Sequence, residues 1–232
     1  MTTTKRPKPL PIEIRVMTPD YAAALDELQK IIFPTLTDDE RFSAANYRKH
    51  IEVFPDGQYM AVLRHPDGDV VVGACSAIRQ HFDFDHIQHT FAELTDNGWL
   101  TTHEPDGDWL YGIDMSVHPA YRRRRIASRM YRVRMNVVRR LNLRGEIIGG
   151  MMPGYDRHRK KYSIEDYVQQ VADGTLTDPT LTAQMKQGFA VRGILYDHIT
   201  DPRSNDCAVL MVRDNPDYME TSLENMPEYE GV

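Results

Sequence analysis

The strongest constraint on the fold comes from residues 108–155, where two predicted strands flank one predicted helix. The segment DWLYGIDMSVHP (108–119) is typical of a strand ended by a proline, and RGEIIGGMMPGY (144–155) of a strand closed by Pro-Gly. Between them, apolar residues recur at the four- and three-residue steps of an amphipathic helix: Ile126, Met130, Val133, Val137 and Leu141. Strand, helix and strand form a crossover, so we expect strands 108–117 and 146–151 to be parallel neighbours.

The remaining elements are predicted from caps, turns and alternation. Before the crossover we expect a strand at 12–17, a helix from Pro19 to about 32, a helix after Thr37 that ends near Val53, and a hairpin over 58–80 around a Pro-Asp-Gly turn. After it we expect a helix at 163–174 capped by Ser163, a shorter helix at 178–188, and strands at about 189–199 and 206–213.

Composition favours one globular domain in a reducing compartment. The 232 residues are 41% hydrophobic, and the two cysteines, Cys75 and Cys207, lack a metal-type spacing. We expect both thiols to be buried and reduced, and the protein to be cytoplasmic, because no apolar run approaches a signal or membrane segment. We divide the chain into a leader (1–11), one domain (12–215) and an acidic tail (216–232).

Four consecutive arginines open the predicted central helix, in RRRRIAS (122–128). The first backbone N–H groups of a helix lack intrahelical acceptors and its dipole is positive there, so a helix start binds phosphates. Cations are unfavourable at such a position unless an anion joins them. The alternative is that the arginines form only a solvated helix face. The net charge of −6 argues against a nucleic-acid-binding protein.

Several histidines lie among acids and aromatics between residues 81 and 107: His81, His86, His89 and His103. No two of them have the tight spacing of a helical ligand pair, and no cysteine joins them. We therefore expect surface loop and a short helix there, and no metal site.

The stretch VHPAYRRRRIASRMYRVRMNVV resembles motif A of the GNAT N-acetyltransferase superfamily, Arg/Gln-x-x-Gly-x-Gly/Ala at the start of a long helix. Position by position, Arg122 takes the leading place and Ala127 the final small-residue place, whereas Arg125 stands where the family usually has glycine. The segment QGFAVRGIL (187–195) is similar to the family's helix-Gly-Phe-strand transition. The resemblance implies an α/β (α+β) GNAT fold with a mixed, mostly antiparallel sheet and a splayed parallel central strand pair.

More narrowly, NLRGEIIGGMMPGY, SIEDYVQQVADGTLTDPTLTAQMKQGF and NPDY resemble the GNAT domain that precedes a carbon-nitrogen hydrolase domain in certain two-domain bacterial proteins. The chain ends at Val232, near the point where the hydrolase would follow. We expect a stand-alone version or a truncation, without amidase or nitrilase chemistry.

In the GNAT fold the splayed strands admit the pantetheine arm of acetyl-CoA, and backbone amides of motif A hold its pyrophosphate. The resemblance therefore implies backbone contacts to pantetheine from Met115, Ser116 and Val117. It implies a pyrophosphate site at residues 122–128, which are Arg122, Arg123, Arg124, Arg125, Ile126, Ala127 and Ser128. Gly149 and Gly150 would let the cofactor approach the second strand; ordinary packing glycines are the alternative.

Transfer to an amine requires a base, an oxyanion donor and protonation of the thiolate. Asp114 is our candidate base, with Asp108 and His118 in reserve, because alternation would place it on one face with Gly112 and Ser116. The alternative is a structural acceptor for a loop amide. A backbone N–H near Met115 would bind the oxyanion.

Many family members protonate the thiolate with a tyrosine four residues before the Gly of the Gly-Phe pair. Here Gln184 occupies that place, and Gln cannot act as an acid. Tyr155 is our candidate, and Tyr111 and Tyr196 are weaker ones.

The leading hypothesis is an acyl-CoA-dependent N-acetyltransferase acting on a small-molecule or protein amine. The alternatives are a non-catalytic acyl-CoA-binding module and a nucleic-acid-binding protein that uses the arginine helix. Regions 34–56 and 81–107 are expected to form the acceptor pocket. Their acids would suit a cationic amine: Asp38, Asp39, Glu40, Asp83, Asp85 and Glu93. We expect no membrane partner, and the oligomeric state, a homodimer included, stays open.

Overall fold

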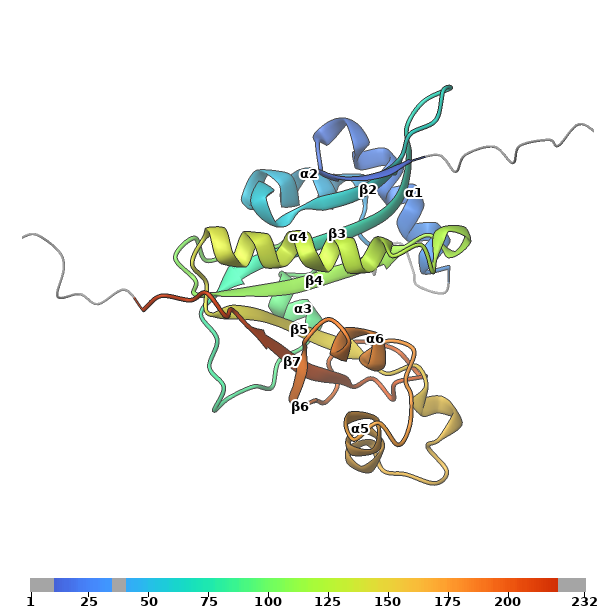
Figure 1. Cartoon of the computed structure of the whole chain (residues 1–232), viewed down its shortest axis with the longest axis vertical. Coiled ribbons are helices and arrows are strands. Elements are labelled where there is room, and N and C mark those ends of the chain that lie inside the picture. Colours follow the sequence, from blue (N-terminus) through green and yellow to red (C-terminus); the bar gives the residue numbers. More distant parts are fainter. Residues whose placement is uncertain (1–10, 35–40, 221–232) are drawn as a thin grey trace, which may run out of the picture.

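The computed structural model describes residues 11–34 and 41–220. A seven-stranded mixed sheet in the order β1-β2-β3-β4-β5-β7-β6 forms its centre (Figure 1). The strands are β1 (Ile12–Val16), β2 (Tyr59–Leu63), β3 (Val70–Gln80), β4 (Trp109–Val117), β5 (Gly145–Met151), β6 (Ala190–Leu195) and β7 (Ala208–Asp214). Among the described strands, β4 and β5 pair in parallel and every other pair of neighbours is antiparallel.

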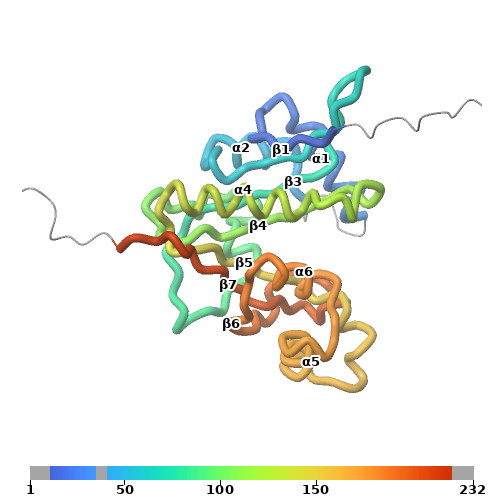
Figure 2. Tube along the Cα trace, viewed as in Figure 1, coloured from blue at the N-terminus to red at the C-terminus, as the bar shows by residue number. Residues whose placement is uncertain are grey.

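Helices cover both faces of this sheet. They are α1 (Ala22–Ile32), α2 (Ala44–Val53), α3 (Phe91–Thr95), α4 (Ile126–Arg140), α5 (Ile164–Ala172) and α6 (Leu181–Met185). The expected α+β architecture with a parallel central pair is confirmed, and so is the crossover from β4 through α4 to β5. The chain trace in Figure 2 shows α4 running along the sheet beside these two strands.

Alternation along the strands separates two faces. Met60 on β2 packs with residues of α1 and α2, whereas its neighbour Ala61 packs with Ile126 and Met130 of α4. We call these the α1 face and the α4 face. A further core on the α1 face joins Leu94 of α3 to strand residues such as Ile147. On the α4 face, α5 and α6 pack against the end of β5 and against β7.

A buried ion network lies beneath the paired end of β4 and β5. Arg134 of α4 and Glu146 of β5 are 1% and 0% exposed, and their side chains form an ion pair of 2.5 Å. Arg213 of β7 pairs with the same carboxylate and donates to the backbone carbonyl of Tyr131. A carboxylate between two guanidinium groups balances part of the desolvation cost that each charge would carry alone.

Caps, turns and alternation in the sequence predicted most helices and strands, but some observed ends differ from the predicted ones. Ser163 caps α5 by accepting from the amide of Asp166, as predicted. The strand predicted at 189–199 ends at Leu195, because Asp197 has a positive φ of 50° and turns the chain. The second helix begins at Ala44 after the cap Ser43. The segment 37–40, with the acids Asp38, Asp39 and Glu40 that were predicted at the start of this helix, lies outside the described residues.

Cys75 and Cys207 are free and buried, as expected. Within the part of the chain that the structure describes, no helix combines the length and apolarity of a membrane span.

Candidate active site

Strands β4 and β5 pair at one end only. Their register ends where Gly112 lies opposite Ile148. Beyond this point β4 remains paired with β3 as far as Val117. Likewise, β5 remains paired with β7 as far as Met151. The two strands therefore diverge, and the facing backbone groups of their last residues have no strand partner. The predicted splay is confirmed.

A β-bulge marks the start of the gap. Ser76 of β3 lies opposite Asp114, but Ala77 lies opposite Gly112, so Ile113 is an extra residue in β4. Alternation therefore fails here. Gly112 faces the α4 side, against Arg134, whereas Asp114 faces α1. The prediction that Gly112 and Asp114 share one face is wrong for this reason, although Asp114 and Ser116 do share one.

Asp114 is half-buried at the gap and its carboxylate already has partners. The hydroxyl of Ser116 donates to Oδ1 at 2.6 Å, and Nε2 of Gln29 on α1 donates to Oδ2 at 3.3 Å. Burial raises the pKa of this carboxyl to about 6. It is thus an acceptor for two side chains, one on β4 and one on α1, and neither donor is the loop amide of the alternative role. Its raised pKa places its titration close to neutral pH.

The turn into α4 has the backbone that a glycine would favour. Arg123 and Arg125 have φ values of 62° and 60°, and Arg125 is the N-cap of the helix. Its side chain makes no capping hydrogen bond. The amides of the first turn, at Ile126, Ala127 and Ser128, are therefore not capped by the residue before them, which leaves them available to an anion.

All four arginines of this turn are exposed. Arg122 donates from Nε to the carbonyl of Val117, and the guanidinium of Arg124 lies 5.1 Å from the ring centre of Tyr121. These contacts keep two of the cations beside the end of β4, where the strand enters the turn.

Gly149 and Gly150 are the first residues of β5 beyond the paired segment, and they face opposite sides. A Cβ on Gly149 would lie 2.9 Å from Nε2 of His198, on the α1 face. A Cβ on Gly150 would lie 2.5 Å from Oε1 of Gln184, on the α4 face. Both glycines thus allow a polar side chain to approach the backbone at the gap.

The predicted tyrosines lie in different surroundings. Tyr155 is buried against Tyr167, and its hydroxyl donates to the carbonyl of Tyr162. Tyr196 is exposed and donates to Glu165. Sequence reasoning did not single out Tyr131 of α4, whose hydroxyl lies 3.5 Å from Nε2 of Gln184. A hydroxyl therefore stands near the position where the family usually has its tyrosine.

Asp108 and His118, the reserve candidates for the base, form hydrogen bonds away from the gap. Asp108 accepts from Arg144 at 2.6 Å at the start of β4. His118 accepts from the amide of Ala120 through Nδ1, within the turn that follows β4. Neither contact involves the splayed residues of β5.

A groove of about 380 Å³ opens on the α1 face. Its walls include Phe42, Asn46, Phe91, His198, Ile199 and Thr200. Residues from 34–56 and 81–107 take part, as predicted for a pocket. The β6–β7 connection, which supplies residues 197–200, was not predicted. Asp38, Asp39 and Glu40 lie outside the described residues, and Asp83 and Asp85 do not line the groove.

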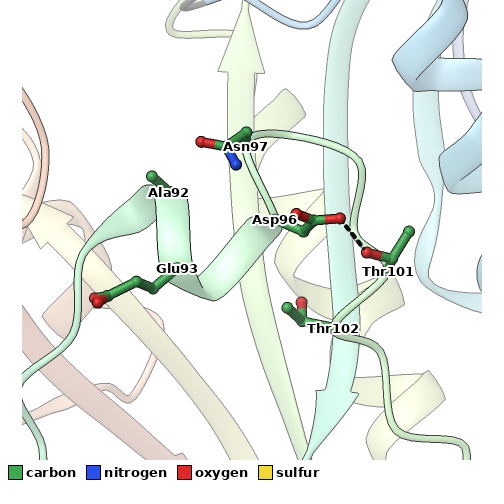
Figure 3. A pocket seen from close by; sticks show the side chains of 6 residues that line it. All are labelled: Ala92, Glu93, Asp96, Asn97, Thr101 and Thr102. Atoms are coloured by element: carbon green, nitrogen blue, oxygen red, sulfur yellow. Dashed lines mark hydrogen bonds between the residues drawn. The ribbon is translucent and has the colours of Figure 1, made fainter.

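Figure 3 shows a neighbouring hollow on the outer side of α3, about 310 Å³, lined by Ala92, Glu93, Asp96, Asn97, Thr101 and Thr102. Asp96 and Thr101 are hydrogen-bonded across it. None of its lining residues belongs to β4, to β5 or to the β6–β7 connection that carries His198, so it stands apart from the gap.

Among the described residues, no three His, Cys, Asp or Glu side chains are grouped as metal ligands. His86 is exposed beside Asp83, and His103 stacks on Phe54 at 4.6 Å between ring centres. The segment around them is loop with the short helix α3, as predicted.

The crossover, the splay and the turn into α4 agree with a sequence comparison. The profile of the Acetyltransferase (GNAT) family matches residues 23–148, more than half of the chain. The chain belongs to the GNAT acetyltransferase family. Its members bind acyl-CoA.

Two proteins of Bacillus subtilis (strain 168) are similar to this GNAT chain. Probable hydrolase YhcX is 37% identical over 194 residues, which are 83% of this chain and 36% of that protein. Uncharacterized N-acetyltransferase YkwB is 29% identical over 212 residues, 91% of this chain and 92% of that protein. The chain thus spans little more than a third of YhcX. The resemblance to a GNAT domain fused to a hydrolase is confirmed.

Among solved structures, the GphF GNAT-like decarboxylase in complex with isobutyryl-CoA has a TM-score of 0.74 at 24% identity. The match covers 88% of this chain and 99% of that one. It shows the same GNAT fold. Against the family pattern, this chain has two departures: Arg125 at the usual glycine, and Gln184 at the usual tyrosine.

Proposed function

We propose that this protein binds an acyl-CoA, with acetyl-CoA as its donor, and transfers the acyl group to a primary amine by direct attack. The observation that carries the proposal is the divergence of β4 and β5 after Gly112 and Ile148. Met115, Ser116 and Val117 then have one backbone edge without a strand partner. A pantetheine arm has amide groups that can use such an edge as an added strand would.

The turn at residues 122–128, whose four arginines are exposed, would hold the pyrophosphate. Uncapped amides at the start of a 15-residue helix favour an anion, and arginine side chains add charge-assisted hydrogen bonds. The left-handed backbone of Arg125 supports this role, because it gives the turn the shape for which the family uses glycine.

Catalysis would need few groups. A backbone N–H near Met115 would stabilise the oxyanion, and Asp114, on the α1 face beside the gap, is a candidate proton acceptor. For the thiolate, an acid role for Tyr155 requires its hydroxyl to leave the carbonyl of Tyr162. Comparing Tyr155→Phe with Tyr131→Phe in the transfer assay would decide between the two hydroxyls.

Calorimetric titration with CoA and acetyl-CoA tests the binding site. We expect saturable binding by the wild type and at least tenfold weaker binding by Arg122→Glu and Arg124→Glu. Arg132→Glu, an exposed position further along α4, is the matched control and should bind within twofold of wild type. Absence of binding by the wild type would refute the proposal. Thiol release in the presence of an amine panel then tests transfer.

A second candidate is acyl-CoA chemistry without an amine. The GphF structure is described as a decarboxylase, and Gln184 removes the family's usual acid. Release of CO₂ from a 2-carboxyacyl-CoA, without thiol release, would favour this reading. Binding without either reaction would favour a regulatory acyl-CoA-binding module.

A further inference from the structure

His198 covers the backbone of β5 where the gap begins. It lies on the connection between β6 and β7, and the residue is 4% exposed. Gly149, the first residue beyond the paired segment, leaves room for the ring, since a Cβ there would come within 2.9 Å of Nε2. The edge of His198 that carries Nε2 therefore faces the backbone at the opening between the strands.

The hydrogen bonds of His198 fix which nitrogen carries the proton. Nδ1 lies 2.8 Å from the backbone carbonyl of His89, and a carbonyl oxygen only accepts. Nδ1 is therefore the protonated nitrogen, and Nε2 carries the lone pair. Nε2 has no hydrogen-bond partner among the described residues. Burial lowers the pKa of His198 to about 4, so the ring is neutral at pH 7.

A second layer holds His89 in place. Its Nδ1 donates to the carbonyl of Ile87 at 2.7 Å, so its Nε2 accepts from the hydroxyl of Tyr111 at 2.9 Å. The rings of His89 and His198 meet edge to face, 5.2 Å apart. Tyr111 belongs to the paired part of β4. His198 is thus connected through His89 to the paired end of β4 and β5.

The groove on the α1 face gives an approach to this ring. Phe42, Asn46, Phe91 and Thr200 line it together with His198, and the lining also includes the charged residues Arg41 and Asp197. The groove thus reaches β5 only through His198, whose ring lies against Gly149. A molecule bound in this groove would contact the neutral imidazole from the side of α2 and α3. Asp114 faces the same side, but both of its carboxylate oxygens already accept hydrogen bonds.

We propose that His198 is the catalytic base, taking the proton from the attacking amine through Nε2. The inference rests on the proposed function. The amine lone pair forms the C–N bond while the carbonyl π pair moves to oxygen. The nitrogen, now positively charged, gives one proton to Nε2. Collapse of the adduct breaks the C–S bond, and the thiolate takes up a proton as the imidazolium loses one, which leaves amide and CoA thiol.

The variant His198→Asn tests this role, because an asparagine amide can still donate to the carbonyl of His89 but offers no base at the position of Nε2. We expect kcat/KM to fall at least 100-fold with the Kd for acetyl-CoA within threefold of wild type. Asp114→Asn removes the competing candidate for the proton acceptor and should lose less than tenfold; a 100-fold loss there with wild-type kcat/KM in His198→Asn would assign the proton to Asp114 instead. His158→Asn, in the turn after β5, is the control and should keep wild-type kcat/KM.

A second measurement tests the role of His198 without an amine acceptor. In histidine-labelled protein, the ¹⁵N resonance of Nε2, assigned with His198→Asn, should show an unprotonated nitrogen and shift on saturation with acetyl-CoA. An unshifted resonance, or wild-type kcat/KM in His198→Asn, would overturn the role of His198 while leaving acyl-CoA binding intact. Wild-type protein that binds no acetyl-CoA would instead overturn the proposed function.

Discussion

The guanidinium of Arg134 lies directly against the backbone of Gly112, so that a Cβ at position 112 would collide with its Nη2. Gly112 is the last residue of β4 that pairs with β5, and Glu146, the partner of Arg134, belongs to the paired part of β5. One buried cation therefore contacts both strands at the closed end of the gap. This contact fixes the point from which the strands diverge.

Gly112→Ala should destabilise the protein by about 3 kcal/mol, because the methyl group either overpacks the site or displaces a buried, paired cation. The free energy of unfolding from urea denaturation measures the effect. Gly174→Ala is the control: Gly174 has a φ of 75° with nothing within 4 Å of a Cβ. It should cost only about 1 kcal/mol of backbone strain. Equal costs would contradict the packing argument.

Glu146→Gln should cost about 3–5 kcal/mol, since it leaves Arg134 and Arg213 as uncompensated buried cations. Glu13→Gln is the matched control. Glu13 pairs with Arg15 at the surface, so its loss should cost less than about 1 kcal/mol. Guanidinium denaturation of both variants measures the difference. A loss below 1 kcal/mol in Glu146→Gln would show that the network contributes little.

Arg125→Gly should stabilise the protein by about 0.5 kcal/mol. A left-handed backbone costs a side-chain-bearing residue about 1–2 kcal/mol, which exceeds the entropy that glycine adds to the unfolded chain. Arg124→Gly is the control, because its φ is not positive; it should destabilise by about 0.5–1 kcal/mol. Urea midpoints compare the two. Destabilisation of equal size at both positions would contradict the strain at Arg125.

Periodicity and turn chemistry predicted the elements because their causes are local. The apolar stripe from Ile126 to Val137 places α4 on the sheet, and the hydroxyl of Ser163 caps α5 without help from distant residues. The parallel pair followed from the order strand, helix, strand. These features depend on neighbours in sequence, so the sequence carries them.

The site depends on distant contacts, and these could not be predicted. The bulge at Ile113 exists only relative to β3, so no pattern within β4 reveals that Asp114 turns toward α1. His198 reaches Gly149 through the β6–β7 connection, whose course is set by packing. Gly149 and Gly150 were the one signal available in the sequence. They indicated that another group approaches the backbone of β5 closely, but not which side chains do so.

Asp114 should give the protein a characteristic pH dependence. Burial raises its pKa to about 6 from an ordinary value of 3.8. The folded state therefore binds this proton more tightly than the unfolded chain does. Its contribution to stability is fully present below about pH 4 and is lost as the pH rises to about 6. The free energy of unfolding of wild type minus that of Asp114→Asn should fall over this interval and be constant above about pH 7.

Asp83 provides a control of opposite sign for the pH experiment. The hydrogen bond with His86 lowers the pKa of the Asp83 carboxyl, so its contribution is present above the unfolded pKa and is lost as the pH falls below about 4. The free energy of unfolding of wild type minus that of Asp83→Asn should therefore rise with pH. This rise should occur below the pH interval in which Asp114 titrates. Thermal unfolding at fixed pH steps measures both. Desolvation is the main cause of the raised pKa of Asp114. If the free energy of unfolding of wild type minus that of Asp114→Asn stays constant between pH 4 and 7, the carboxyl at the gap is not desolvated in the folded protein.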